Sequence, residues 1–269
     1  MPFVNNNGVN IHYHVEGDGP PLVLQHGFTS SIRNWYANGY VEPLKQNYRL
    51  ILVDARGHGR SDKPHDSVAY DNKLRVSDVT SVLDELAIDT AHFLGYSMGG
   101  RIGFSIAAYA PERVLSLIIG GMHPYDRSGN ITTEDRVRNL TGGMEAYVSN
   151  QEASSGVKMD PDRRTRLLDN DHEALIAAIS ASRGIPGIEE TITQLPMPCM
   201  LYVGEADAFH PGVEEASMVI PGVMYASFPG LDHGQVSMRS DVVLAPVTEF
   251  LSSVVQPANI ADWQQRTFR

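Results

Sequence analysis

The chain has 269 residues, of which 42% are hydrophobic and 20% are charged. A chain of this length and composition can bury a sizeable core, which excludes intrinsic disorder and fibrous repeats, and one α/β domain with an insertion fits as well as two domains. The 21 Lys and Arg residues against 32 Asp and Glu residues give a formal net charge of −11. Such a field repels nucleic-acid phosphates and anionic lipid, so neither nucleic acid nor a membrane is an expected partner.

The number of cysteines and the pattern of the first residues indicate which cellular compartment to expect. The single cysteine, Cys199, can form neither an internal disulfide nor a multi-cysteine zinc site, and its apolar neighbours indicate core packing. The chain begins without the basic and then apolar run of a signal peptide, and no stretch approaches about 18 uninterrupted apolar residues. We therefore expect a soluble, cytoplasmic protein, and the sequence leaves its oligomeric state open.

Short apolar runs and helical patterns alternate along most of the chain. The predicted elements are, in chain order, strands at 9–15, 22–24 and 50–53, a helix around 79–86, a strand at 91–96, a helix at 98–110, strands at 114–119, 199–203 and 223–228, and a helix at 244–255. Continuous apolar runs are typical of strands buried on both faces. The alternation predicts an α/β fold with a mostly parallel, doubly wound sheet. Pro246 is expected to start or kink the last helix.

The predicted sheet is interrupted between residues 122 and 187. This stretch holds charged helical patterns at 133–140, 161–168 and 173–183 and no convincing strand. We interpret it as a helical cap inserted into a core that is formed by residues 1–121 and 188–269.

One motif carries chemistry. Gly95-Tyr96-Ser97-Met98-Gly99 matches G-x-S-x-G, follows an apolar strand and opens a helix, which is the setting in which a sharp turn exposes a serine above the carboxyl edge of a sheet. Glycine suits positions 95 and 99 because a Cβ there would collide with neighbouring backbone. The alternative interpretation is that Ser97 only caps the helix and that the glycines serve packing.

A serine nucleophile requires a base, which should be a histidine further along the chain. His172, His210 and His233 are the candidates that follow Ser97 at some distance. Only His233 lies in a glycine-bounded loop between the last predicted strand and the last predicted helix, so we predict that His233 is the base.

The orienting carboxylate should follow the preceding strand. Asp207 lies in the loop directly after the strand at 199–203 and is the predicted acid. Glu205 and Asp126 also follow strand ends, and Asp232 neighbours the histidine. We interpret these three as solvated surface carboxylates.

Acyl transfer also needs backbone donors for an oxyanion. The N–H after the nucleophile belongs to Met98, and the loop after the strand at 22–24 offers the N–H of Phe28, where Gly27 lets the backbone turn inward. Phe28 can at the same time be a buried aromatic side chain.

The motifs together resemble those of the α/β-hydrolases. Besides the serine motif, the chain carries, in the family's order, Gln25-His26-Gly27-Phe28, Asp54-Ala55-Arg56-Gly57-His58-Gly59-Arg60-Ser61-Asp62, Gly204-Glu205-Ala206-Asp207 and Asp232-His233-Gly234. The resemblance spans nearly the whole chain outside the insertion. It implies the α/β-hydrolase fold and a serine hydrolase that cleaves a small ester, lactone or related acyl substrate through an acyl-enzyme, with no metal and no organic cofactor.

Departures from familiar members limit what the resemblance implies. Ser97 stands where haloalkane dehalogenases and epoxide hydrolases have aspartate, which argues against those activities. The layout is similar to that of carboxylesterases, enol-lactonases, cofactor-free perhydrolases and hydrolases of carbon–carbon bonds. The insertion matches no subfamily pattern, so the substrate stays open. A non-catalytic small-ligand receptor on the same fold is the alternative of a different class.

Five further residues are candidates for binding roles. His12 and His14 alternate on an early strand, but no third ligand accompanies them at metal-binding spacing, so we interpret them as exposed strand residues. Tyr125, Arg127 and Tyr147 lie in the insertion, where either substrate contact or packing is consistent with their positions.

Overall fold

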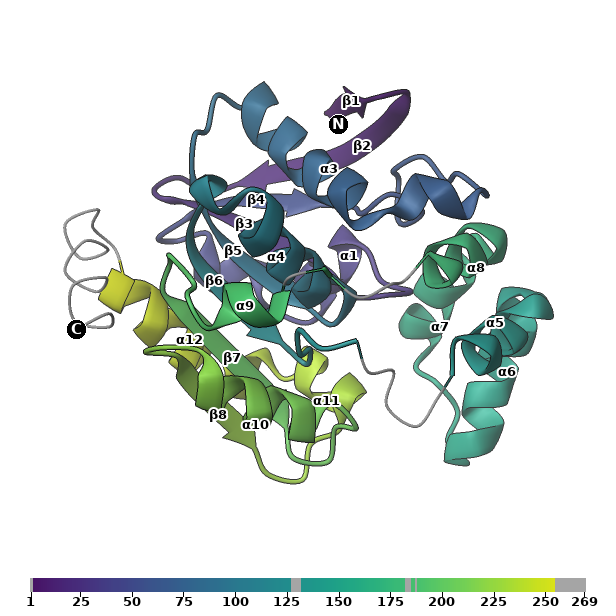
Figure 1. Ribbon diagram of the computed structural model, residues 1–269. Coiled ribbons are helices and arrows are strands. Elements are labelled where there is room, and N and C mark those ends of the chain that lie inside the picture. Colours follow the sequence, from purple (N-terminus) through teal and green to yellow (C-terminus); the bar gives the residue numbers. More distant parts are fainter. Residues whose placement is uncertain (1, 127–131, 182–184, 187, 255–269) are drawn as a thin grey trace.

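An eight-stranded sheet forms the centre of the molecule (Figure 1). The computed structural model describes residues 2–126, 132–181, 185–186 and 188–254. The strands are β1 (Phe3–Asn6), β2 (Val9–Glu16), β3 (Pro21–Gln25), β4 (Arg49–Val53), β5 (Ala91–Tyr96), β6 (Val114–Gly120), β7 (Cys199–Gly204) and β8 (Met224–Phe228). Their order in the sheet is β1-β2-β4-β3-β5-β6-β7-β8, with β1 and β2 antiparallel and the other six parallel. The predicted mostly parallel α/β sheet is confirmed.

Helices cover both faces of the sheet. Successive side chains of a strand point to opposite sides, so a continuous apolar strand contributes to a core on each face. In β3, Leu22 and Leu24 pack into one core and Val23 packs into the other. The first core joins α1 (Ile32–Ala37), α2 (Val41–Leu44), α11 (His233–Met238) and α12 (Ser240–Val254) to the sheet, and the second joins α3 (Asn72–Glu85), α4 (Met98–Tyr109), α9 (Ile188–Ile192) and α10 (His210–Val219). Short 3-10 turns occupy Ser67–Tyr70 and Pro111–Arg113.

Four helices between β6 and β7 lie together at one end of the sheet (Figure 1). They are α5 (Thr133–Thr141), α6 (Gly143–Ser155), α7 (Pro161–Leu168) and α8 (His172–Ser180). Their own small core contains Leu140, Met144, Leu175 and Ile179. Arg75 of α3 ties this group to the core, since its Nη2 donates a 2.9 Å hydrogen bond to the carbonyl of Ala178.

The structure differs from the predicted elements in several places. The last helix begins at Ser240 and not at 244, so Pro246 lies inside it. The helix continues through Pro246 because its apolar face is buried on both sides of the proline. Val243 and Val247 are both fully buried and stabilise this turn. Strand β1 and helices α1, α2, α6, α9, α10 and α11 were not predicted. The ends of two predicted helices, at 182–183 and 255, lie outside the described residues.

The prediction that His12 is exposed is wrong. His12 is 3% exposed, and its Nδ1 lies 2.8 Å from Oδ2 of Asp54, a buried carboxylate that also accepts hydrogen bonds from the backbone N–H groups of Ile32 and Arg60. Pairing with Asp54 keeps the imidazole inside, which a sequence alternation cannot indicate. His14 is partly exposed, and its Nδ1 lies 2.7 Å from the hydroxyl of Tyr36.

Cys199 is fully buried in β7, and burial raises the pKa of its thiol. In the described ranges, every helix is too short or too polar to span a lipid bilayer.

Candidate active site

The turn between β5 and α4 holds Ser97 in a strained backbone conformation. Its φ of +53° and ψ of −113° are rare for a residue with a Cβ. The flanking glycines make room for the turn, since a Cβ on Gly95 would stand 2.3 Å from the carbonyl oxygen of Gly99, and one on Gly99 would stand 2.1 Å from that of Gln25. Only glycine lets α4 start this close to β3 and β5.

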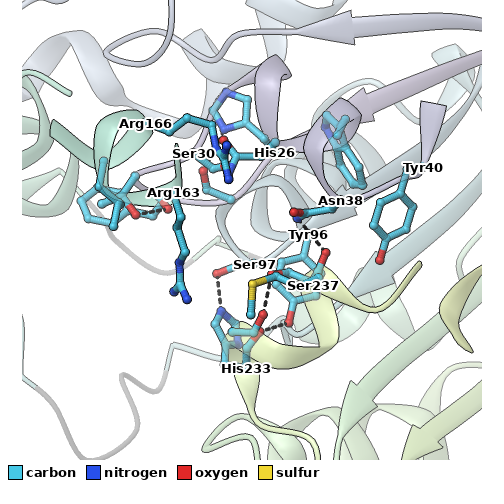
Figure 2. Close-up of a pocket in the computed structure, with 18 residues that line it drawn as sticks. His26, Ser30, Asn38, Tyr40, Tyr96, Ser97, Arg163, Arg166, His233 and Ser237 are labelled. Atoms are coloured by element: carbon cyan, nitrogen blue, oxygen red, sulfur yellow. Dashed lines mark hydrogen bonds between the residues drawn. The ribbon is translucent and has the colours of Figure 1, made fainter. Parts of the chain in front are cut away.

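Ser97, His233 and Asp207 form one hydrogen-bonded series (Figure 2 shows the first contact). Oγ of Ser97 lies 2.9 Å from Nε2 of His233, and Nδ1 of His233 lies 2.7 Å from Oδ2 of Asp207. Because a carboxylate only accepts, Nδ1–H donates to Asp207, and Nε2 is left to accept the proton of the Ser97 hydroxyl. The three residues that the sequence predicts are therefore brought together.

His233 is held from several sides. It is the first residue of the short helix α11, where Asp232 accepts a 2.8 Å hydrogen bond from the backbone N–H of Gln235. The hydroxyl of Tyr96 donates to the carbonyl of His233, and the rings of Tyr96 and Phe209 lie 5.2 Å and 5.3 Å from the imidazole. These contacts fix the ring plane against Ser97.

Asp207 is the buried acid of the series, with a fully covered side chain. Its second oxygen accepts a 2.9 Å hydrogen bond from the backbone N–H of Phe209. The alternatives have other roles: Glu205 is exposed and accepts from Oγ of Ser227, and Asp232 caps α11. Asp126 is exposed, and its charge acts on Arg101.

The backbone of Phe28 and Met98 borders Ser97. A Cβ on Gly27 would stand 3.4 Å from Cβ of Ser97, so the peptide between Gly27 and Phe28 passes beside the serine. Met98 is the first residue of α4, where backbone N–H groups have no acceptor within the helix. The Phe28 side chain is partly buried and packs against helices α5, α6 and α8.

A cavity of about 200 Å³ opens above Ser97. The core contributes Trp35, Asn38, Tyr40, Tyr96 and Met238 to its lining, and α7 contributes Arg163, Arg166 and Leu167 (Figure 2). Nothing in the sequence indicated that Arg163, Arg166 and Leu167 of α7 face this cavity. Tyr125 packs into the core on the α4 side of the sheet, Tyr147 packs against the small core of α5, α6 and α8, and neither lines this cavity. Arg127 lies outside the described residues.

Two buried histidines lie side by side, His26 in the lining of the cavity and His58 with its ring centre 5.4 Å from that of His26. Burial lowers the pKa of His26, and burial together with the neighbouring His26 lowers that of His58 to about 3. His26 accepts a hydrogen bond of 3.1 Å from the N–H of Ala55, so it shapes the loop after β3. Within the described part of the chain, no group of three or more His, Cys, Asp or Glu side chains is arranged to hold a metal ion.

Comparison with known proteins identifies the family. The sequence profile of the α/β hydrolase fold family matches residues 20–240. This chain belongs to the α/β hydrolase fold family. The match includes the turn at Ser97 as well as Asp207 and His233.

Relatives of this α/β hydrolase differ in their named activities. A Bacillus subtilis protein named putative 2-succinyl-6-hydroxy-2,4-cyclohexadiene-1-carboxylate synthase is 27% identical over 266 residues, which cover 91% of this chain and 96% of the relative. A carboxylesterase structure from Nitrososphaera gargenis is similar with a TM-score of 0.83 and 25% identity, covering 94% of this chain and 98% of that one. The enol-lactonase of Burkholderia xenovorans LB400 has the same fold, with a TM-score of 0.79 and 23% identity over 93% of this chain and 100% of the other.

Proposed function

We propose that this protein is a serine hydrolase that cleaves a small ester or lactone through an acyl-enzyme on Ser97. The observation that carries the proposal is the series from Ser97 Oγ through His233 to the buried Asp207, with distances of 2.9 Å and 2.7 Å. A serine hydroxyl becomes a competent nucleophile when a neutral imidazole can take its proton. The 200 Å³ cavity above Ser97 gives a small substrate access to that hydroxyl.

In the first half-reaction, Oγ of Ser97 attacks the acyl carbon while Nε2 of His233 accepts the hydroxyl proton. Asp207 keeps the imidazole in the tautomer that presents Nε2 to the serine, and it stabilises the imidazolium that forms. The backbone N–H groups of Phe28 and Met98 donate to the oxyanion. Each such donor lowers the barrier by about 3 kcal/mol in comparable sites.

The tetrahedral intermediate then collapses, and the imidazolium of His233 gives its proton to the departing alcohol oxygen. A water molecule takes the place of the alcohol, His233 removes its proton, and the resulting hydroxide attacks the acyl group on Ser97. As the second intermediate collapses, the bond from the acyl carbon to Oγ of Ser97 breaks, the imidazolium of His233 returns its proton to Oγ, and the acid is released. These steps involve only this chain's own groups and water.

We assign residues 122–187 as a cap that shapes the substrate cavity. The support is that Arg163, Arg166 and Leu167 of α7 line the cavity from the side opposite the sheet. In this arrangement the core supplies the chemistry and the cap supplies substrate selection.

The test is hydrolysis of 4-nitrophenyl acetate and butyrate by the purified protein and by Ser97→Ala. We expect wild-type turnover and a loss of at least about a thousandfold in kcat in the variant, with unchanged circular dichroism. Mass spectrometry should find a fluorophosphonate on Ser97 of the wild type. A Ser97→Ala variant that keeps its turnover would refute the proposal.

Other outcomes identify the alternatives. Tight ligand binding without turnover or labelling would indicate a receptor on this fold. Labelling of Ser97 without ester turnover would indicate a reactive serine with another reaction. Carbon–carbon cleavage, perhydrolysis and a reaction like that named for the Bacillus subtilis relative would then be assayed.

A further inference from the structure

Two arginines of α7 project into the cavity above Ser97. Arg163 and Arg166 are three residues apart and therefore lie on the same face of the helix. Both line the cavity, and in Figure 2 the guanidinium group of Arg163 reaches toward Ser97 and His233. Their charges thus face the same space as the proposed nucleophile.

Neither guanidinium group has a carboxylate partner among the described residues. Nε of Arg166 is buried and makes no hydrogen bond. Other arginines of this region are paired: Nη2 of Arg164 lies 2.6 Å from Glu145, and Nη1 of Arg33 lies 2.5 Å from Asp169. Arg163 and Arg166, which face the cavity, thus differ from these two neighbouring arginines in having no carboxylate partner in the part of the chain that the structure describes.

The cavity itself provides no compensating negative charge. Within the described ranges its lining contains neither Asp nor Glu. Asp207 is nearby, but it is buried behind His233 and hydrogen-bonded to it. A third cation adds to the field, since the guanidinium of Arg136 lies 5.5 Å from the ring centre of Phe28, a cavity residue. A protein with a net charge of −11 has thus gathered unpaired cations at one site.

Arg163 and Arg166 are each partly buried, and an anionic ligand in the cavity would supply the counter-charge that the described residues around them do not provide. The planar fork of a guanidinium group matches a carboxylate through two parallel hydrogen bonds. We propose that the substrate carries a carboxylate, which Arg163 and Arg166 bind on the α7 side of the cavity while the ester carbonyl lies at Ser97. This inference rests on the proposed hydrolase function and names its substrate class: small esters or lactones of carboxylate-bearing compounds.

Two matched substrate pairs test this inference. In the first pair, 4-acetoxybenzoate and 4-acetoxybenzamide carry the carboxylate or its neutral amide on the leaving group. In the second, monomethyl adipate and the methyl ester of adipic acid monoamide carry them on the acyl group. We expect the wild-type kcat/KM to be about 10- to 100-fold higher for the carboxylate in at least one pair, and to fall with added salt.

Matched variants locate the effect. Arg163→Gln and Arg166→Gln should each lower kcat/KM for the preferred carboxylate by about 10- to 100-fold and change that of its amide less than about threefold. Arg164→Gln, a neighbouring change on the same helix, should keep the preference because Arg164 pairs with Glu145 outside the cavity. Equal rates within both pairs, or equal losses for carboxylate and amide, would overturn the inference.

A binding measurement separates this inference from the proposed function. Calorimetry with the Ser97→Ala variant should show that 4-hydroxybenzoate or adipate binds, and that adding Arg163→Gln weakens this binding about 10-fold or more. Ester turnover without any carboxylate preference would refute the inference and leave the serine hydrolase intact. Carboxylate binding that depends on Arg163, in a protein that hydrolyses no ester, would refute the function and leave the anion site.

Discussion

Arg56 and Asp78 form a two-pronged ion pair in the interior. Nε and Nη2 of the guanidinium each lie 2.6 Å from one carboxylate oxygen, and the two side chains are only 3% and 4% exposed. The pair fixes the loop after β4 to helix α3, and Asn6 of β1 donates a further 2.7 Å hydrogen bond to Asp78. Three separate segments of the chain therefore depend on one carboxylate.

Replacing that carboxylate should destabilise the fold strongly. Asp78→Ala leaves the Arg56 guanidinium buried without a counter-charge, and we expect the free energy of unfolding to fall by about 3–5 kcal/mol. Urea denaturation measures this. Asp84→Ala, which breaks the more exposed pair between Asp84 and Arg113, should cost less than about 1 kcal/mol. Similar costs for the two variants would contradict the role given to the buried pair.

Backbone strain at Ser97 predicts a difference between two small substitutions. Ser97→Gly and Ser97→Ala both remove the hydroxyl, but only glycine adopts a φ of +53° without penalty. We expect the glycine variant to be more stable than the alanine variant by about 1 kcal/mol. Thermal unfolding of the two proteins side by side checks this, and an alanine variant at least as stable as the glycine variant would show that the turn stores no strain.

The carboxylate of Asp207 should matter for rate more than for substrate binding. In Asp207→Asn the amide no longer selects the tautomer of His233 that presents Nε2 to Ser97, so we expect kcat to drop by about 10³- to 10⁴-fold with little change in KM. Glu205→Gln serves as the control, because Glu205 lies in the same loop, is exposed and contacts Ser227. Comparable losses in both variants would argue against Asp207 as the orienting acid.

Buried histidines should make the protein less stable in mild acid. Burial lowers the pKa of His58 to about 3 and that of His92 to about 4, both below the value of about 6.5 in the unfolded chain. The unfolded state therefore binds protons first, so the stabilisation is complete above pH 6.5 and is lost as the pH falls toward 4. Each histidine should cost about 1–2 kcal/mol at pH 5.

Urea denaturation at pH 7.5 and pH 5 measures this loss. His92→Gln, which keeps a polar group near Oγ of Ser116, should lose less stability between the two pH values than the wild type. An equal loss in both proteins would show that His92 does not titrate as proposed.

The sequence was most informative where local chemistry decides the structure. Continuous apolar runs predicted the buried strands, and glycine at positions 95 and 99 predicted the close approach that their missing Cβ atoms allow. Ser97, Asp207 and His233 could be predicted to meet because each follows a strand of one parallel sheet. The buried position of His12 could not, since it depends on Asp54, which lies on another strand's loop.

The sequence could not predict that Arg163 and Arg166 face the cavity, because their surroundings also depend on distant parts of the chain. The charged pattern at 161–168 predicted a helix, and α7 has those bounds. Which face of that helix meets Ser97 depends on how α5 to α8 pack against the rest of the molecule. No periodicity within eight residues distinguishes Arg163 from Arg164. In the sequence, an arginine that faces a cavity cannot be distinguished from an arginine that faces solvent.

The complete burial of Cys199 leaves this protein without a reactive thiol at its surface. A cysteine introduced at Val157, which is 68% exposed between α6 and α7, would be the sole target for a maleimide dye or a nitroxide spin label. A second one at Met218 of α10, 76% exposed, would complete a donor–acceptor or spin pair between the two parts of the molecule. Movement of α6 and α7 relative to the sheet can thus be followed spectroscopically without first removing a native cysteine.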